Sequence, residues 1–220
     1  GTLKGGIARC RALQGKELSF NNLVDLEAAW NLVQEFSEPS TAIIKHTNPC
    51  GCSTRPTLAE SYRKAYEADT VSAFGGVIGF NRVVDAETAD EVNKIFVEAI
   101  AAPGFTPQAV EKFASKKNLR LVEVDTSASL KGELHLKQVS GGMLVEEKDE
   151  HILSASDLKT VTVKQATPDQ ITNLLFAWKV CKHVKSNAIV YVQDAQVVGV
   201  GAGQMSRVDS VKLGASRAML

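Results

Sequence analysis

The sequence predicts an α/β fold, in which short apolar strands alternate with amphipathic helices. Residues 21–36 place apolar side chains at helical spacing, and residues 41–45 form a short β-branched run typical of a buried strand. Farther along, a helical pattern over 167–186 precedes two strand-like runs at 188–192 and 196–201. This alternation indicates helices layered on a sheet.

The composition is that of an ordinary globular chain of 220 residues. Basic and acidic residues number 25 each, so we expect neither a nucleic-acid binder nor a membrane-surface protein. No apolar run approaches the roughly 18 residues of a membrane helix, and the start, GTLKGGIARCRALQGKEL, has no signal core, so we expect a cytoplasmic protein. The cysteines are too few and scattered for a disulfide framework: Cys10, Cys50, Cys52 and Cys181.

Helices and strands follow one another closely up to residue 124. Asp85 is a typical N-cap residue, and the segment that it opens, 84–100, starts as a helix and runs into apolar residues. The expected helices are 21–36, 57–68, the segment from 84 and 106–117, and the expected strands are 41–45, 75–80 and 119–124.

The helix at 167–186 has the clearest start signal in the chain. Thr167 and Gln170 form a capping-box pattern, and Pro168 occupies the first helical position. The preceding residues, 125–160, are less regular and predict only short strands and loops.

The last segment, SRVDSVKLGASRAML (206–220), is helix-like but has neither a cap nor a terminal glycine. This pattern predicts one α/β unit that opens after residue 155 and stops early. We expect a first subdomain over 1–155 and the start of a second, incomplete one over 156–220.

The stretch IIKHTNPCGCST (43–54) sets Lys45 and His46 at the end of an apolar run. On a regular strand these side chains would point to opposite faces, so they could share one site only if the strand ends there. Asn48 before Pro49 favours extended backbone, and a sharp turn would follow. Ligand sites in open α/β sheets lie at strand ends, but a solvated lysine beside a hydrogen-bonded histidine in a surface loop is the alternative.

His46, Cys50 and Cys52 also raise the question of a metal. Zinc deaminases carry H-x-E and then P-C-x-x-C, whereas this chain has C-x-C and lacks the glutamate. Three ligands so close in sequence would strain a tetrahedral site. We therefore expect no zinc, with both cysteines as small residues lining a turn.

The glycine-rich stretch VVGVGAGQMSR (197–207) is not a dinucleotide fingerprint, because Gln204 stands where the third glycine is needed. Arg207 could bind a phosphate or carboxylate, or the stretch could be a plain strand-to-helix turn. Asn187 could cap the preceding helix or offer its amide to a ligand. SAFGG (72–76) reads as a turn, with Phe74 in the core.

Taken together, several motifs resemble one family. They are IIKHTNPCG, EADTVSAFGG, FVEAIAAP, LLFAWKVCKHVKSNAIVY and VGVGAGQMSRVDS, and QGKELSFNNL also fits. In this order they resemble the formyltransferase region of the bacterial bifunctional purine enzyme, AICAR transformylase/IMP cyclohydrolase, where AICAR is aminoimidazole carboxamide ribonucleotide. The resemblance covers nearly the whole chain.

The resemblance implies a layered fold of the cytidine deaminase type without zinc, built from two related halves. It implies formyl transfer from 10-formyltetrahydrofolate to the amine of AICAR, in the synthesis of the purine nucleotide IMP. It also implies a homodimer with sites between subunits, and it leaves a potassium requirement open, since some members show one.

The same resemblance assigns roles to individual positions. His46 matches the proton acceptor, Lys45 the group that stabilises the transition state, and Asn187 the amide that binds the reacting region of AICAR. The remaining matches are Gly75, Glu98 and Arg207 as nucleotide contacts and Val208 as a folate contact.

The sequence also departs from the family pattern. The cyclohydrolase domain, the R-Y-G-x-N-P-H-Q segment and the later D-A-F-F-P-F segment are absent. We therefore expect little or no transformylase activity from this polypeptide alone. A non-catalytic nucleotide-binding module is the main alternative, and a zinc deaminase is a third that metal analysis would test.

Overall fold

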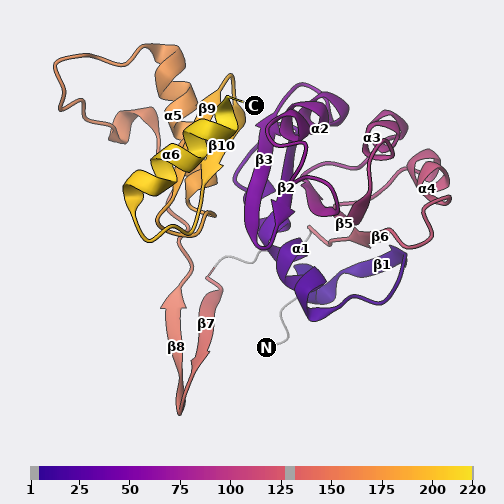
Figure 1. Cartoon of the computed structure of the whole chain (residues 1–220). Coiled ribbons are helices and arrows are strands. Elements are labelled where there is room, and N and C mark those ends of the chain that lie inside the picture. The colour runs from indigo at the N-terminus through magenta and orange to yellow at the C-terminus, as the bar shows by residue number, and fades with distance from the viewer. Residues whose placement is uncertain (1–4, 127–131, 220) are drawn as a thin grey trace.

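The computed structural model describes residues 5–126 and 132–219 (Figure 1). Within these residues the main feature is an 8-stranded sheet flanked by helices. The first four residues of the N-terminal stretch considered above, and residues 127–131 of the predicted irregular segment, lie outside the described residues.

Helices and strands alternate along most of the chain. The strands are β1 Arg11–Gln14, β2 Ser40–Lys45, β3 Asn48–Thr54, β4 Gly76–Phe80, β5 Val97–Ala102, β6 Arg120–Glu123, β7 Leu134–Val139, β8 Gly142–Glu147, β9 Ile189–Gln193 and β10 Gln196–Gly201. The α-helices are α1 Phe20–Val33, α2 Leu58–Glu67, α3 Ala86–Val92, α4 Pro107–Phe113, α5 Pro168–Cys181 and α6 Arg207–Ala218. The mixed α/β class predicted from the sequence is confirmed.

The main sheet runs in the order β1-β6-β5-β4-β2-β3-β10-β9. β4, β5 and β6 are parallel, whereas β2 pairs antiparallel with both β3 and β4. β10 joins β3 through the antiparallel pair Gln196 and Ser53, which attaches the C-terminal part to the first (Figure 1). β7 and β8 form a separate hairpin that projects away from both parts (Figure 1).

Neighbouring side chains of β2 enter two different cores. Ile43 packs with residues of α2, α3 and α4, whereas Ile44 packs with Leu26 and Trp30 of α1. Successive strand residues point to opposite faces, so a strand covered on both sides is apolar throughout. Phe176 of α5 belongs to the same core as α1, so this core continues into the C-terminal part.

The segment that opens at residue 84 is a helix followed by a strand. Asp85 is the N-cap, and its side chain accepts a hydrogen bond from the main-chain N–H of Thr88 at 2.8 Å. However, α3 ends at Val92, and the apolar residues that the sequence analysis attached to it form β5. Periodicity alone cannot separate a short apolar strand from a helix end, and pairing with β4 and β6 decides the matter here.

The predicted turn after Lys45 is shorter than expected. Only His46 and Thr47 form it, and the chain returns at once as β3. Ala42 of β2 lies opposite Cys52, and Cys52 is 0% exposed. A Cβ on Gly51 would approach the main-chain oxygen of Ala65 to 1.9 Å, so glycine lets α2 pack directly on β3. Residues expected to line a turn are therefore strand residues.

The predicted C-terminal elements are confirmed, except that α5 ends at Cys181 and not at residue 186. Thr167 and Gln170 make the reciprocal hydrogen bonds of a capping box at the start of α5. β9 and β10 meet at Asp194 and Ala195, both with φ of 50°. In the part of the chain that the structure describes, no helix is both long and apolar enough to cross a membrane.

Candidate active site

Lys45 and His46 lie at the tip of the hairpin formed by β2 and β3. β2 ends at Lys45, whose partner across the hairpin is Asn48, so His46 and Thr47 alone form the loop. Their φ angles are 51° and 65°. Two successive positive φ values are those of a type I′ turn, whose twist matches that of the flanking strands. The strand thus ends where a shared site for Lys45 and His46 requires.

The amine of Lys45 is held against the loop before β4. Its Nζ donates to the main-chain oxygens of Phe74 and Gly75, each at 2.9 Å. Gly75 has a φ of 65°, and a Cβ there would lie 3.3 Å from Lys45 Nζ. Two predicted site residues from separate motifs are therefore in direct contact.

Phe74 does not enter the core as the sequence analysis expected. Its side chain is 62% exposed, whereas the neighbouring Ala73 is 1% exposed. The ring of Phe74 lies 5.5 Å from that of Phe96, between centroids. An exposed aromatic pair beside Lys45 is a surface on which a planar ligand could stack.

A cleft of about 260 Å³ lies beside the hairpin tip, between the first part of the chain and the C-terminal part. It exists because β3 and β10 are joined by one residue pair, Ser53 with Gln196, among the described residues. Pro49 on β3 has no N–H to extend the ladder. The lining comprises Lys45, His46, Asn48, Pro49, Cys50, Ala68, Asp69, Ser72, Gly199, Val200, Ala202, Leu213 and Arg217.

Three polar residues of this cleft were missed by the sequence analysis. Asp69 accepts hydrogen bonds from the main-chain N–H of Ser72 at 2.8 Å and from its Oγ at 2.7 Å. Arg217 of α6 approaches the same carboxylate at 3.6 Å. The spacing of Asp69 and Ser72 is a turn signal that the sequence does carry. No sequence pattern near Arg217 predicts its contact, because its partner Asp69 is distant in the chain.

The glycines of β10 allow close packing of α6 on the strand. A Cβ on Gly199 would lie 2.2 Å from the main-chain oxygen of Gly214, and one on Gly201 would lie 1.9 Å from that of Ser210. Both contacts are with α6, which therefore packs directly on the strand. Gly203, in contrast, has open space around it.

Asn187 is not the C-cap of the preceding helix, because α5 ends at Cys181 with Lys182 as its cap. Its side-chain amide donates to the main-chain oxygens of Gln204 and Met205, each at 3.0 Å. Asn187 therefore organises the loop that leads into α6.

Arg207 and Val208, the other predicted residues of this region, are the first residues of α6 and are exposed. Asn48 joins the two groups of predicted residues, because its Oδ1 accepts from the main-chain N–H of Lys185 at 3.0 Å. The hairpin tip is thereby tied to the loop that carries Asn187.

Glu98 is placed differently from the other predicted residues. It lies on β5 and is not among the residues that line the cleft. Its carboxylate accepts from Arg120 at 2.7 Å, and Arg120 also donates to the main-chain oxygen of Glu17 at 3.0 Å. No local sequence pattern predicts this ion pair.

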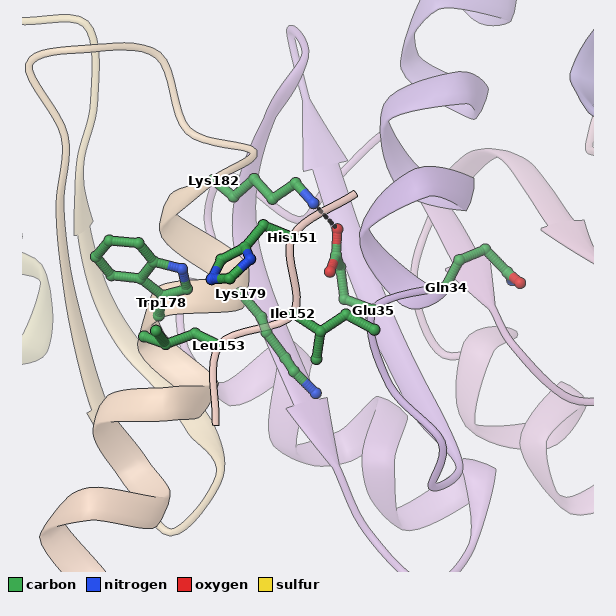
Figure 2. A pocket seen from close by; sticks show the side chains of 8 residues that line it. All are labelled: Gln34, Glu35, His151, Ile152, Leu153, Trp178, Lys179 and Lys182. Carbon is green, nitrogen blue, oxygen red and sulfur yellow. Dashed lines mark ion pairs between the residues drawn. The ribbon is translucent and has the colours of Figure 1, made fainter. Parts of the chain in front are cut away.

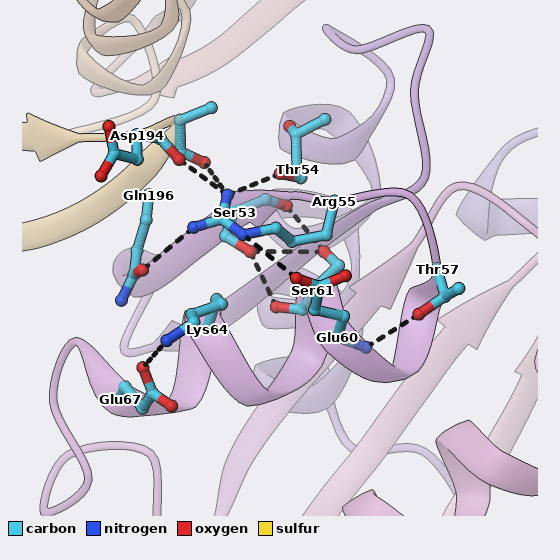
Figure 3. A network of polar contacts seen from close by, with 11 residues as sticks. Ser53, Thr54, Arg55, Thr57, Glu60, Ser61, Lys64, Glu67, Asp194 and Gln196 are labelled. Carbon is cyan, nitrogen blue, oxygen red and sulfur yellow. Dashed lines mark hydrogen bonds and ion pairs between the residues drawn. The ribbon is translucent and has the colours of Figure 1, made fainter.

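Arg55 fastens the β9–β10 turn to β3 (Figure 3). Its guanidinium donates to the main-chain oxygens of Thr54 and Asp194, each at 2.7 Å, and to the side chain of Gln196 at 3.2 Å. The side chain is 13% exposed. Arg55 therefore holds the β9–β10 turn against β3, at the only paired position of the two strands in the described chain.

A second, smaller cavity of about 70 Å³ lies between the end of α1 and α5 (Figure 2). Glu35 accepts from Lys182 and from His183 there, each at 2.9 Å. Burial favours the neutral form of Glu35, but the hydrogen bonds from His183 and Lys182 outweigh it and lower its pKa. The remaining lining is Gln34, His151, Ile152, Leu153, Trp178 and Lys179.

Metal ligands do not gather around His46. In residues 5–126 and 132–219, no three His, Cys, Asp or Glu side chains form a group that could hold a metal ion. Burial raises the pKa of the Cys50 thiol to about 12, and it raises the pKa of Cys52 as well. Because metals bind the thiolate, such thiols are poor ligands.

The comparisons with known proteins agree with the resemblance seen in the sequence. The profile of the family described as AICARFT/IMPCHase bienzyme matches residues 2–217. The bifunctional purine biosynthesis protein PurH of Ruegeria sp. (strain TM1040) is 52% identical over 99% of this chain, and that of Agrobacterium fabrum (strain C58) is 48% identical over 99%. PurH of Pelodictyon phaeoclathratiforme is 52% identical over 91%.

These matches cover 42%, 41% and 38% of the three relatives, so the chain spans about two fifths of their length. The family profile, by contrast, matches nearly the whole of this chain. The chain belongs to the AICARFT/IMPCHase bienzyme family.

Proposed function

We propose that this chain carries the formyl-transfer chemistry of its family, from 10-formyltetrahydrofolate to the amine of AICAR. The observation that carries the proposal is the hairpin tip, where Lys45 and His46 are adjacent and both line one cleft. A fixed cation and a near-neutral base at one site are what acyl transfer to a weak amine requires.

The chemistry divides between the two side chains. The AICAR amine is conjugated with its ring and carboxamide, so it needs to lose a proton as it attacks the formyl carbon. His46 accepts that proton, while Lys45 stabilises the negative charge on the formyl oxygen. The new bond joins the amine nitrogen to the formyl carbon, the bond from that carbon to N10 of the folate breaks, and N10 takes up a proton.

Other predicted residues complete the proposal. Asn187 hydrogen-bonds the reacting region of AICAR, Gly75, Glu98 and Arg207 contact the nucleotide, and Val208 contacts the folate. The Glu98 carboxylate is paired with Arg120, so a nucleotide that contacts Glu98 has to bind beside this ion pair or displace Arg120 from it.

The wider proposals follow the family resemblance. We propose a zinc-free fold of the cytidine deaminase type, with related subdomains over 1–155 and 156–220, and a cytoplasmic homodimer that a potassium ion could support. Because the chain spans about two fifths of its relatives, we propose that it has little activity without further segments. Turnover by the 220-residue chain near that of a full-length relative would contradict this.

The first test is calorimetric titration of the chain with AICAR. We expect saturable binding that weakens in Arg207→Ala and persists in His46→Ala, because His46 acts on the reacting atoms. His135→Ala is the matched control, since His135 lies on the exposed β7–β8 hairpin. Absence of binding by the folded chain would contradict a nucleotide pocket made by these residues.

Formyl transfer separates this proposal from a non-catalytic nucleotide-binding module. The predicted residues are divided between the hairpin tip and the start of α6. This division favours the nucleotide-binding module, since an open site could bind the nucleotide without catalysing formyl transfer. Loss of the chain's residual formyl transfer in His46→Ala, with AICAR affinity kept, supports catalysis. Unchanged activity in that variant would reject it.

A further inference from the structure

The loop that carries His46 adopts a backbone conformation that its own residues disfavour. His46 and Thr47 both have positive φ, at 51° and 65°. Type I′ turns are dominated by Asn and Gly, because a Cβ crowds the backbone in this region. For the β-branched Thr47 the conformation is a true outlier. Such residues persist only where their surroundings hold them, and they gather at functional sites.

One side chain from outside the hairpin reaches this loop. Asp25 of α1 accepts a hydrogen bond from the main-chain N–H of Thr47, with 2.7 Å between N and Oδ1. The bond crosses from helix to hairpin tip, so it fixes the tip to the rigid part of the fold. Bonds within the loop, from Thr47 Oγ1 and Asn48 Nδ2 to the main-chain oxygen of His46, cannot supply that anchor.

α1 is itself well fixed, which makes Asp25 a firm support. Ser19 and Asn22 form its capping box, and Leu26, next to Asp25, is 0% exposed. The carboxylate is thus carried by a capped helix whose neighbouring residue is buried in the core.

We propose that Asp25 is a positioning residue, which holds the His46–Thr47 turn in its left-handed conformation and thereby directs His46 toward the cleft. This rests on the proposed function only for what His46 does there. Asp25 touches no reacting atom in this proposal and acts through the main chain of Thr47.

The test uses the isotope-labelled 220-residue chain and nuclear magnetic resonance. In Asp25→Ala, we expect exchange of the Thr47 amide with solvent to rise by about tenfold or more, the loss expected for a hydrogen bond to a carboxylate. Asp25→Asn keeps an acceptor oxygen and should retain most of the protection. Glu27→Ala, on the same helix and exposed, is the matched control and should change nothing.

A rescue variant distinguishes positioning from general damage. Glycine accepts positive φ freely, so Asp25→Ala with Thr47→Gly should restore the turn without the carboxylate. We expect the imidazole signals of His46 to shift on addition of AICAR in the parent chain, to lose that response in Asp25→Ala and to regain it in the double variant.

The outcomes separate this inference from the proposed function. Unchanged Thr47 exchange in a folded Asp25→Ala chain overturns the inference, and so does a His46 response that survives the loss of protection. If His46 fails to respond to AICAR even in the parent chain, the proposed function fails, while the Thr47 exchange still decides whether Asp25 holds the turn.

Discussion

The Nζ of Lys45 lies 2.9 Å from the main-chain oxygen of Gly75, in the loop that leads into β4. A second bond, to the oxygen of Phe74, leaves one of the three donor positions of the ammonium for a ligand. The amine is therefore aimed by main-chain atoms. Gly75 can approach it because it carries no side chain.

Replacing Gly75 by alanine should disturb both the backbone and the amine. With φ at 65°, a Cβ would meet Lys45 Nζ and the Phe96 ring, each at 3.3 Å. We expect Gly75→Ala to lower the free energy of unfolding by about 2 kcal/mol, the upper cost of a left-handed non-glycine residue. Urea denaturation measures this loss.

Gly203→Ala is the control for that change. Gly203 has nearly the same φ, 67°, but a Cβ there meets nothing within 4 Å. It should cost about 1 kcal/mol, from backbone strain alone. Equal losses in the two variants would mean that contact with Lys45 is unimportant at Gly75.

Removal of Arg55 should loosen the junction between β3 and the β9–β10 turn. Its side chain is 13% exposed and its guanidinium donates to Thr54, Asp194 and Gln196, so Arg55→Ala should cost about 2 kcal/mol. Single-tryptophan variants, Trp30→Phe and Trp178→Phe, leave one fluorescent reporter in each part. We expect the C-terminal reporter to unfold earlier in Arg55→Ala.

Arg63 offers the comparison for Arg55. Its side chain is 41% exposed, and it pairs with the exposed Glu87 and with Glu91, whose side chain is 16% exposed. Arg63→Ala should therefore cost less than about 1 kcal/mol. If Trp30 and Trp178 still report the same unfolding transition in Arg55→Ala, Arg55 does not couple the unfolding of the first and C-terminal parts of the chain.

Glu35 should make stability depend on acidic pH. Burial raises its pKa, but hydrogen bonds from His183 and Lys182 bring the net value below the ordinary 4.5. A depressed pKa in the folded state gives stability that is present above the unfolded value and is lost as pH falls through the folded value.

The comparison is with Glu35→Gln, which cannot ionise. We expect the parent chain to be the more stable of the two at neutral pH and to lose that advantage on acidification below 4.5. Urea denaturation of both proteins across this pH range measures the difference. If the stability advantage of the parent chain grows on acidification, the pKa of Glu35 is raised and not lowered by folding.

Cys50 should be an unreactive thiol despite its place beside the cleft. Burial, helped by the nearby charge of Asp69, raises its pKa to about 12, so little thiolate exists at neutral pH. We expect iodoacetamide to modify Cys50 and Cys52 far more slowly in the folded chain than in denaturing urea. Mass spectrometry of the digested protein reads each site, and rapid labelling of folded Cys50 would contradict this.

The sequence predicted structural features correctly where they depend on neighbouring residues in the chain. The caps Asp85 and Thr167 and the end of β2 at Lys45 were all predicted, because each depends on neighbours within a few residues. β3 was missed because Asn, Pro and Gly read as a turn. Pairing with β2 and burial of Cys52 overrode that preference.

By itself, the sequence determined the α/β class, the family and the pairing of Lys45 with His46 at a strand end. Only the tertiary structure decided which distant groups support them: Gly75 beneath the amine, Asp25 behind the turn, and Arg217 across the cleft from Asp69. The physical reason is range. Caps and strand ends are set by short stretches of chain, whereas these contacts arise between segments that only the folded core brings together.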